Sequence, residues 1–474
     1  MKIEYFLLSF VWFYWISWIA VSNDFKVFNS TLYQVLGIHF KFGEIILFLI
    51  TSAFVYSLFS VANLVIKDFW LKNFRFFNNK KFQIFLLVVA IIGYLTTFCI
   101  WKAELLTVKL FFMYFAPLLH LCFNVTMSTL WFFKLSVQKK SIKNFWITLF
   151  SINLILVLVC TYSPSISDNI NIKKPKVFAH RGNVKKAPEN TLLAFQEAQR
   201  SGVDGFEADV AISFDGIPFL IHDKTLTRTT NVAKVFPDRK NDLAESFTWK
   251  ELQMLDAGSW YLLSDPYGSV STFSQRKKDK IKKQKIMALS DFAAYAIKTK
   301  KQIIFDYRTP MVFGHPYMFK HVQTIVSTLL KSGIDQTKVL WISGPQYGYV
   351  LDFAPKFTQV YGAHVDQELI KKRKLKMLIL EYNDIMPFEV EKYEKEEIKI
   401  LMYTSLKKWT FSLSWCEGAY GMISDDPDLH VSMKKPILLM TKYTYFVLIF
   451  FSFALTVIVL HILSKSLKFM ISKQ

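Results

Sequence analysis

The sequence has 474 residues, of which 52% are hydrophobic and 17% aromatic. A soluble domain of this size rarely carries so much apolar mass, so the composition favours a membrane protein over an ordinary soluble enzyme. The formal net charge is +21 at pH 7. Much of the Lys and Arg lies in short loops beside apolar segments, which argues against a nucleic-acid partner. The four cysteines are too few for the disulfide framework of a small secreted domain.

Apolar runs long enough to cross about 30 Å of hydrocarbon occur in the first third of the chain and near its end. We expect membrane-spanning helices near residues 4–22, 44–66, 82–101, 110–133, 145–163 and 443–463. The predicted parts are a five-helix membrane part at 1–164, a polar domain at 165–436 with an insertion at 232–285, and a sixth helix with a basic tail at 437–474.

The basic loops between these runs predict the orientation. Lys and Arg are frequent after the second and fourth runs and in the C-terminal tail, and such loops usually face the cytosol. Asn29, in Asn29-Ser30-Thr31, is a glycosylation candidate on the other side. We therefore expect a multi-pass protein of the plasma membrane or an endomembrane, with the lipid bilayer as a partner. Both termini would be cytosolic, and the polar domain would be extracellular or lumenal.

The polar domain alternates short apolar strands with helical patterns, which indicates βα units around a parallel sheet. Eight strands over about 260 residues match an α/β (β/α)8 TIM barrel. The predicted fold class is therefore a multi-span α-helical membrane protein that carries a TIM barrel. The candidate strands lie at 176–179, 205–210, 218–221, 302–305, 339–342, 359–361, 398–403 and 421–423.

Polar residues follow or end the first four candidate strands, where a TIM barrel places its chemistry. Phe206, Ala208 and Val210 make one face of the second strand apolar. The acidic face of that strand should therefore point into the barrel, where unpaired carboxylates are costly without a cation. The set consists of two histidines, three acids and two arginines: His180, His222, Glu207, Asp209, Asp306, Arg181 and Arg308.

This combination of residue types suits cleavage of a phosphodiester. Carboxylate oxygens favour one hard divalent cation, Ca²⁺ or Mg²⁺, over Zn²⁺. A cation neutralises phosphate charge and activates a bound hydroxyl, and an arginine binds phosphate oxygens with its fork of donors. Two histidines can serve as base and acid near neutral pH. We therefore predict a metal-dependent phosphoric diester hydrolase.

Each residue also has a plainer interpretation. Glu207 and Asp209 could be a solvated strand face, and His222 could be a hydrogen-bonded structural histidine. Asp306 could simply pair with Arg308. It is the joint spacing at consecutive strand ends that favours the functional interpretation.

The motifs Phe178-Ala-His-Arg-Gly182, Ala187-Pro-Glu-Asn-Thr191, Gly205-Phe-Glu-Ala-Asp209 and His222-Asp-Lys-Thr-Leu-Thr-Arg-Thr-Thr-Asn231 resemble those of the glycerophosphodiester phosphodiesterase family. The resemblance covers essentially residues 176–430. The six-span frame, with Asp256-Ala-Gly-Ser-Trp260 and Phe305-Asp-Tyr-Arg308, looks like the membrane-bound animal subgroup.

The resemblance implies a role for each site residue. His180 and His222 would be the catalytic pair, and Glu207, Asp209 and Asp306 would bind the metal. Arg181 and Arg308 would contact the substrate phosphate, with Arg308 in place of the lysine common in the family. Glu189 and Asn190 would shape the first loop, and the insertion would form a lid.

The resemblance also implies the substrates. These would be glycerophosphodiesters, such as glycerophosphoinositol or glycerophosphocholine, or lipid-linked phosphodiesters such as GPI anchors at the outer membrane face. A lysophospholipase D-type activity and a catalytically weak membrane receptor remain alternatives. The sequence does not indicate whether water or a neighbouring hydroxyl attacks the phosphorus, nor does it indicate an oligomeric state.

Overall fold

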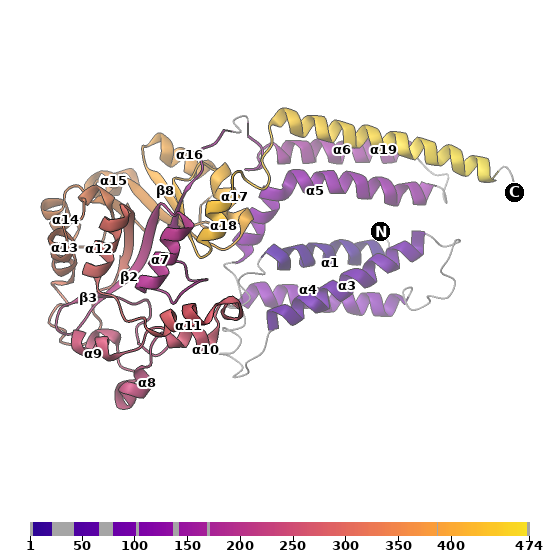
Figure 1. Cartoon of the computed structure of the whole chain (residues 1–474). Helices are drawn as coiled ribbons and strands as arrows, with labels where there is room; N and C mark the ends of the chain where they lie inside the picture. Colours follow the sequence, from indigo (N-terminus) through magenta and orange to yellow (C-terminus); the bar gives the residue numbers. More distant parts are fainter. Residues whose placement is uncertain are drawn as a thin grey trace. The chain divides into compact units, whose positions relative to one another are not determined.

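The computed structural model describes residues 3–20, 42–65, 79–100, 104–135, 142–167, 171–385 and 387–471 (Figure 1). The chain divides into two compact units, each described by itself below. A helical unit comprises 1–171 and 438–474, and a second unit comprises 172–437. The glycosylation candidate Asn29 lies outside the described residues.

The helical unit contains a helix at each of the predicted apolar runs. Its helices are α1 (Ile3–Ala20), α3 (Phe42–Val65), α4 (Lys80–Ile100), α5 (Glu104–Leu135), α6 (Ile142–Cys160) and α19 (Lys442–Ile471). Aromatic side chains join α1 to α3, since Trp15 stacks on Phe54 at 5.0 Å and donates a hydrogen bond to Thr51 Oγ1 at 3.0 Å. His120 of α5 is buried and hydrogen bonds with Tyr445 Oη at 2.7 Å and Asn153 Oδ1 at 2.9 Å, which joins α5 to α19 and α6.

The predicted membrane architecture is contradicted by these helices. In the described part of the chain, no helix combines the length and the apolar character needed to cross a membrane. The predicted multi-span membrane fold and the predicted location, with cytosolic termini and an extracellular or lumenal barrel, are therefore wrong. Apolar residues around a whole helix are typical of a helix buried in protein as well as of a span, so the apolar runs could not separate the two.

The second unit is a closed barrel with one extra strand. Its described strands form a nine-stranded sheet in the order β1-β9-β8-β7-β6-β5-β4-β2-β3, and an additional pairing of β1 with β2 closes the ring. All neighbours pair in parallel except β3, which is antiparallel to β2. The strands are β1 (Lys176–Ala179), β2 (Gly205–Ile212), β3 (Pro218–Leu220), β4 (Gln302–Tyr307), β5 (Val339–Ile342), β6 (Thr358–Tyr361), β7 (Met377–Glu381), β8 (Lys399–Ser405) and β9 (Gly421–Ser424).

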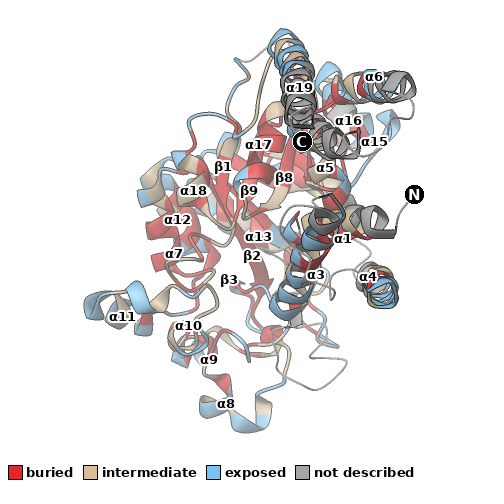
Figure 2. Cartoon of the chain, turned by 90° about the vertical axis from the view of Figure 1, so that its right-hand side faces the viewer, coloured by how far each residue is buried: buried red, intermediate tan, exposed pale blue. Residues whose placement is uncertain are grey.

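Helices surround this barrel, as Figures 1 and 2 show, with buried residues toward the strands and exposed residues outside. The helices between barrel strands are α7 (Leu192–Ser201), α12 (Leu289–Thr299), α13 (His321–Lys331), α14 (Tyr347–Phe353), α15 (Gln367–Arg373), α16 (Pro387–Lys395) and α17 (Lys408–Cys416), and α18 (Pro427–Ser432) follows β9. The ends of α7 show why such a helix forms. Thr191 caps its first turn, and Gly202 ends it in the left-handed region with φ 84°.

The strands separate two apolar layers because successive side chains point to opposite faces. Phe206 and Ala208 pack with Phe195 and Phe292 of the surrounding helices. Glu207 and Asp209 therefore face the interior, as the sequence pattern predicts. The interior cluster consists of Phe178, Ile304, Leu340, Val360, Met377, Ile379, Leu401 and Ile423.

Two predicted strand assignments differ from the structure. The candidate strand at 218–221 is not a member of the parallel ring, because β3 forms a hairpin with β2 in which Val210 pairs with Leu220. The ring is completed instead by β7, which lies between β6 and β8. No strand was predicted at the position of β7, although most of its residues are apolar.

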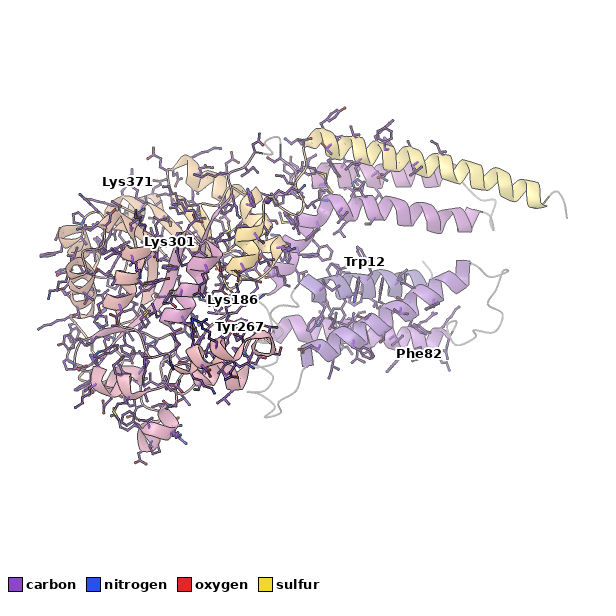
Figure 3. The ribbon with its side chains drawn as sticks, viewed as in Figure 1. Trp12, Phe82, Lys186, Tyr267, Lys301 and Lys371 are labelled. Carbon is purple, nitrogen blue, oxygen red and sulfur yellow. The ribbon has the colours of Figure 1, made fainter. Side chains whose placement is uncertain are left out.

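The insertion at 232–285 consists of short helices rather than an open loop. It contains α8 (Val232–Val235), α9 (Trp249–Met254), α10 (Ser259–Ser264) and α11 (Gln275–Lys282), with 3₁₀ turns at Pro237–Arg239, Ala244–Ser246 and Val270–Thr272. It contacts the loop after β1, since Tyr261 Oη donates to Val184 O and Ser269 Oγ donates to Lys185 O, both at 2.8 Å. Figure 3 marks this region with Lys186 and Tyr267.

Candidate active site

The predicted site residues occupy the carboxyl ends of adjacent barrel strands. Asp209 on β2 pairs in register with Asp306 on β4, while Ala179 at the end of β1 lies between Phe206 on β2 and Ser424 on β9. Residues that follow these strands therefore emerge at one mouth of the barrel, the face at which TIM barrels carry their chemistry.

His180 follows β1 and lies between two carboxylates. Its Nδ1 is 2.5 Å from Asp425 Oδ1, and its Nε2 is 3.8 Å from Glu207 Oε2. A carboxylate accepts a proton but does not donate one, so Nδ1–H donates to Asp425 and Nε2 faces the mouth. Burial disfavours the charged imidazolium, but Asp425 and Glu207 outweigh burial and raise the pKa of His180.

A tight turn joins this histidine to the acids of β2. Arg181 and Gly182 both have positive φ, at 54° and 89°. A Cβ at Gly182 would lie 2.6 Å from the Cβ of Ala194, so the turn leaves no room for a side chain there. This conformation allows the Arg181 backbone N–H to donate to Glu207 Oε2 at 2.9 Å. The turn thus fixes Glu207 beside His180.

Asp209 is held from two sides. Arg181 Nε forms an ion pair with Asp209 Oδ2 at 3.1 Å, and Arg181 Nη1 donates to Glu189 Oε1 at 3.2 Å. Asn190 has φ 56° and donates from Nδ2 to Asp209 Oδ2 at 2.8 Å. Glu189 and Asn190 therefore connect the first loop to the acidic strand.

Glu207 and Asp209 are buried, whereas Asp306 is exposed, and Asp209 repels each of the other two acids. Burial raises the pKa of Glu207, and the neighbouring Asp209 raises it further. Burial and Asp209 also raise the pKa of Asp306, whereas His222 acts in the opposite direction. Both histidines act on these acids electrostatically, since His180 lowers the pKa of Glu207 and His222 lowers that of Asp306.

His222 follows β3 and is supported by a chain of charges. Its Nδ1 donates to Asp223 Oδ1 at 2.7 Å. Arg228 binds both oxygens of Asp223, at 2.6 and 2.9 Å, and both oxygens of Glu189, at 2.7 Å each. Burial alone would raise the pKa of Asp223, but His222 and Arg228 hold it well below its usual range. The side chain of His222 is 45% exposed, so this support leaves it open to the mouth.

Arg308 has partners that the sequence did not predict. Its Nε donates to Glu245 Oε1 at 2.6 Å, its Nη1 to His222 O at 2.8 Å and its Nη2 to Asp223 O at 3.0 Å. The guanidinium therefore binds the backbone of the loop that carries His222.

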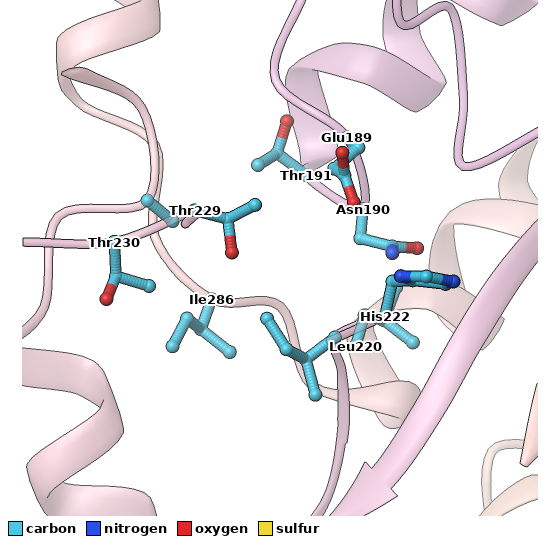
Figure 4. A pocket seen from close by; sticks show the side chains of 10 residues that line it. Glu189, Asn190, Thr191, Leu220, His222, Thr229, Thr230 and Ile286 are labelled. Carbon is cyan, nitrogen blue, oxygen red and sulfur yellow. The ribbon is translucent and has the colours of Figure 1, made fainter. Parts of the chain in front are cut away.

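A pocket lies beside His222, and Figure 4 shows Asn190 and His222 on one side of it and Thr229 and Thr230 on another. Its walls come from the first loop, the end of β3, the loop that follows β3, and the insertion with the residue directly after it. Its lining residues are Glu189, Asn190, Thr191, Leu220, Ile221, His222, Thr229, Thr230, Ala257 and Ile286.

Three supporting residues of this site were not predicted from the sequence: Asp223, Arg228 and Asp425. Asp425 follows the last barrel strand, and the rule that places chemistry at strand ends could have found it. Tyr267 belongs to the insertion, and after burial itself the charges of Asp425 and Glu189 raise its pKa most. No sequence signal ties Tyr267 or Arg228 to these partners.

The carboxylates fit a hard cation by their chemistry, although they are not gathered around one point. In residues 171–385 and 387–437, as in the other described ranges, no group of three or more His, Cys, Asp or Glu side chains has the geometry of a preformed metal site. Arg181 pairs with Asp209. Burial first, and then the neighbouring charge of Asp209, raise the pKa values of Glu207 and Asp306, and a bound divalent cation would favour the charged carboxylates again.

A family model matches this unit. The model of the glycerophosphoryl diester phosphodiesterase family covers residues 180–429, more than half of the chain, and includes both histidine motifs. The chain belongs to this family. The resemblance inferred from the sequence is therefore confirmed, and the chain is an enzyme, a phosphoric diester hydrolase.

Relatives match over most of the chain. Glycerophosphodiester phosphodiesterase domain-containing protein 5 of Gallus gallus is 29% identical over 456 residues, which cover 93% of this chain and 74% of the relative. Glycerophosphoinositol inositolphosphodiesterase GDPD2 of Homo sapiens is 28% identical over 454 residues, with 94% and 83% covered. A solved phosphodiesterase of Oleispira antarctica, in complex with the product sn-glycerol-3-phosphate, is 21% identical with a TM-score of 0.44, and the match covers 55% of this chain and 96% of that one.

Proposed function

We propose that this glycerophosphodiester phosphodiesterase hydrolyses glycerophosphoinositol or glycerophosphocholine in a metal-dependent reaction, with His180 and His222 as the catalytic pair. One observation carries the proposal. Each histidine donates Nδ1–H to a carboxylate, Asp425 or Asp223, and so keeps Nε2 for proton transfer. Two imidazoles oriented in the same way at one barrel mouth suit a reaction that needs both a base and an acid.

The phosphate would lie between the histidines, bound by Arg181. Two of the guanidinium nitrogens of Arg181 already face Asp209 and Glu189. The fork geometry leaves its outer donors for the oxygens of a phosphodiester. Because Glu189 also binds Arg228, the same carboxylate would position the phosphate ligand and the support of His222.

Glu207, Asp209 and Asp306 would hold one divalent cation, Ca²⁺ or Mg²⁺ rather than Zn²⁺, because their oxygen donors suit a hard ion. Such an ion would neutralise phosphate charge and lower the pKa of a bound hydroxyl. The mutual repulsion of these acids supports this assignment.

In this mechanism one histidine removes a proton from the attacking water or from the neighbouring glycerol hydroxyl. The other histidine gives a proton to the leaving alkoxide. Attack by water yields glycerol 3-phosphate and an alcohol if the alcohol leaves, whereas attack by the neighbouring hydroxyl yields a cyclic phosphate. The name of the human relative, a glycerophosphoinositol inositolphosphodiesterase, supports glycerophosphoinositol as the first substrate to test.

The test is phosphorus NMR of purified protein with glycerophosphoinositol, glycerophosphocholine, a lysophospholipid or a GPI-anchored reporter, each with and without chelator. We expect a chelator-sensitive phosphomonoester or cyclic product from the two glycerophosphodiesters. Cleavage of the lysophospholipid or the reporter alone would replace this substrate assignment with one of the lipid alternatives. No turnover of any substrate would support the catalytically weak receptor.

A further inference from the structure

Arg308 hydrogen bonds with a carboxylate and with main-chain carbonyls beside the proposed catalytic His222. It follows β4, and its backbone N–H donates to Val210 O of β2 at 3.3 Å. Its Nε binds Glu245, a residue of the insertion whose side chain is fully buried. A buried carboxylate is costly unless it is paired, so this ion pair fixes the position of the guanidinium.

The other end of the guanidinium binds main chain. Nη1 donates to the carbonyl of His222 and Nη2 to the carbonyl of Asp223. Consecutive carbonyls are thereby held by one planar group, which restrains the backbone dihedrals between them. His222 itself is half exposed and lies in a loop, so the restraint acts on a residue that packing holds only in part.

We propose that Arg308 and Glu245 form a clamp that positions His222 for proton transfer, with Arg308 acting through the loop backbone. This inference rests on the proposed function, because it presupposes that His222 is catalytic. It gives the insertion a defined part in the reaction, since Glu245 contacts neither histidine and acts only through Arg308.

A lysine could not take this role. An ammonium group has three donors but no fixed plane, so it cannot hold a carboxylate on one edge and two carbonyls on the other. The clamp therefore gives a physical reason for arginine at position 308. A residue that only neutralised phosphate would tolerate lysine.

The test compares Arg308→Lys, Glu245→Gln and the double variant with wild type by steady-state kinetics. We expect each single variant to lower kcat at least about tenfold with KM changed less than about twofold, because misplacement of a catalytic group acts on the chemical step. The double variant should lose little more than the worse single variant, because both changes break one clamp.

A second substrate separates positioning from a general loss of structure. Glycerophosphocholine and the p-nitrophenyl ester of glycerol 3-phosphate differ in leaving-group pKa, so the ratio of the kcat losses that His222→Ala causes on the two substrates is a signature of proton transfer at His222. The clamp variants should show the same ratio of kcat losses between the two substrates as His222→Ala. If the clamp variants instead raise KM and keep kcat, Arg308 is a phosphate ligand and the clamp is refuted.

Matched controls come from the same insertion. Arg239 binds Asp242, Glu251 and Ser246 O in a similar network, at 2.8 to 3.0 Å. Arg239→Lys and Glu251→Gln should lower the melting temperature as the clamp variants do, yet leave kcat unchanged. Equal kcat losses in both sets would make the effect one of stability and overturn the proposal. Retained activity in His222→Ala would refute the proposed function itself, whereas an inactive His222→Ala with fully active clamp variants would refute the clamp alone.

Discussion

At the scale of single residues, the two proposed catalytic histidines share one device. The Nδ1 of His180 faces Asp425, and the Nδ1 of His222 faces Asp223. Each carboxylate selects the tautomer of its histidine and stabilises the imidazolium that forms when Nε2 takes a proton. The device orients both rings and leaves the Nε2 atom of each for proton transfer.

Replacement of Asp425 tests this device for His180. Asp425→Asn keeps the size of the side chain but no longer selects the Nδ1–H tautomer or stabilises the imidazolium. We expect kcat to fall about 10²-fold or more, within the range of general acid–base catalysis, while KM stays nearly constant. The measurement is steady-state hydrolysis of glycerophosphoinositol. Asp352→Asn, on the exposed side of α14, is the matched control, and an Asp425→Asn enzyme as fast as that control would contradict the prediction.

Sequence reasoning could name the residues on or just after strands, such as His180, Glu207 and Asp209, because strand side chains alternate and barrel chemistry lies at one end. It could not name Asp425 as the partner of His180, because 245 residues separate the pair and only barrel closure brings them together. The pairing of Glu245 with Arg308 could not be predicted either, because it depends on how the insertion packs against the end of β4.

At the scale of elements, the sequence predicted where most strands form but not which strands pair with one another. The segment at 218–221 has strand-like residues, but its pairing partner and direction depend on a tight turn after β2 rather than on its own pattern. The ring strand β7 has an apolar run of the same kind, and its place between β6 and β8 follows from the order of the whole sheet. Local pattern therefore predicted strands better than it predicted their partners.

Gly205 tests the packing between β1 and β2. A Cβ there would overlap the ring of Phe178 and lie 2.9 Å from the carbonyl oxygen of Gln302. We expect Gly205→Ala to lower the free energy of unfolding by about 1 to 3 kcal/mol through overpacking. Urea denaturation measures this effect. Gly348→Ala, on α14 with open space around its Cα, should be neutral or slightly stabilising, and an equal cost at both positions would rule out overpacking as the cause.

His430 on α18 makes stability depend on pH. It is fully buried, accepts from Ser424 Oγ at 2.6 Å and stacks on Phe411. Burial lowers its pKa to about 4, although Asp425 and Asp426 act in the opposite direction. A histidine with an ordinary pKa in the unfolded chain takes up a proton as pH falls below about 6.5, while the folded one does not. The neutral, buried His430 therefore contributes its full stabilisation of the folded state above pH 6.5, and this contribution is lost as pH falls toward 4.

The size of this effect can be measured by urea denaturation at pH 7.5 and pH 5. We expect His430 to account for about 2 kcal/mol of stability lost between these two values. His430→Gln cannot take up the proton, so the variant should show a decrease smaller by that amount. Equal decreases in the variant and wild type would show that His430 does not cause the pH dependence.

At the scale of the whole molecule, the barrel unit combines a stable ring with a crowded acidic mouth. The acids of β2 and β4 lie in register at the end of strands whose other residues form the core. Folding therefore brings together negative charges that the unfolded chain keeps apart. A cation that binds only the folded state should offset the repulsion between these charges and so stabilise the whole barrel unit.

Calcium or magnesium should therefore raise the melting temperature. At a free cation concentration about 100 times its dissociation constant, binding adds about 2.7 kcal/mol to the free energy of unfolding. Scanning calorimetry with chelator and with added cation measures this difference. Asp306→Asn should abolish most of the increase, whereas a stabilisation that persists in the variant would place the cation elsewhere.

The most direct test of the central claim is the value of kcat/KM for glycerophosphoinositol in wild type, His180→Ala, His222→Ala and the double variant. Groups that serve one transition state are strongly non-additive. We expect each single variant to lose at least about 10²-fold, and the double variant to lose far less than the product of the two. Full activity in either single variant, or losses that simply multiply, would contradict a shared catalytic role for His180 and His222.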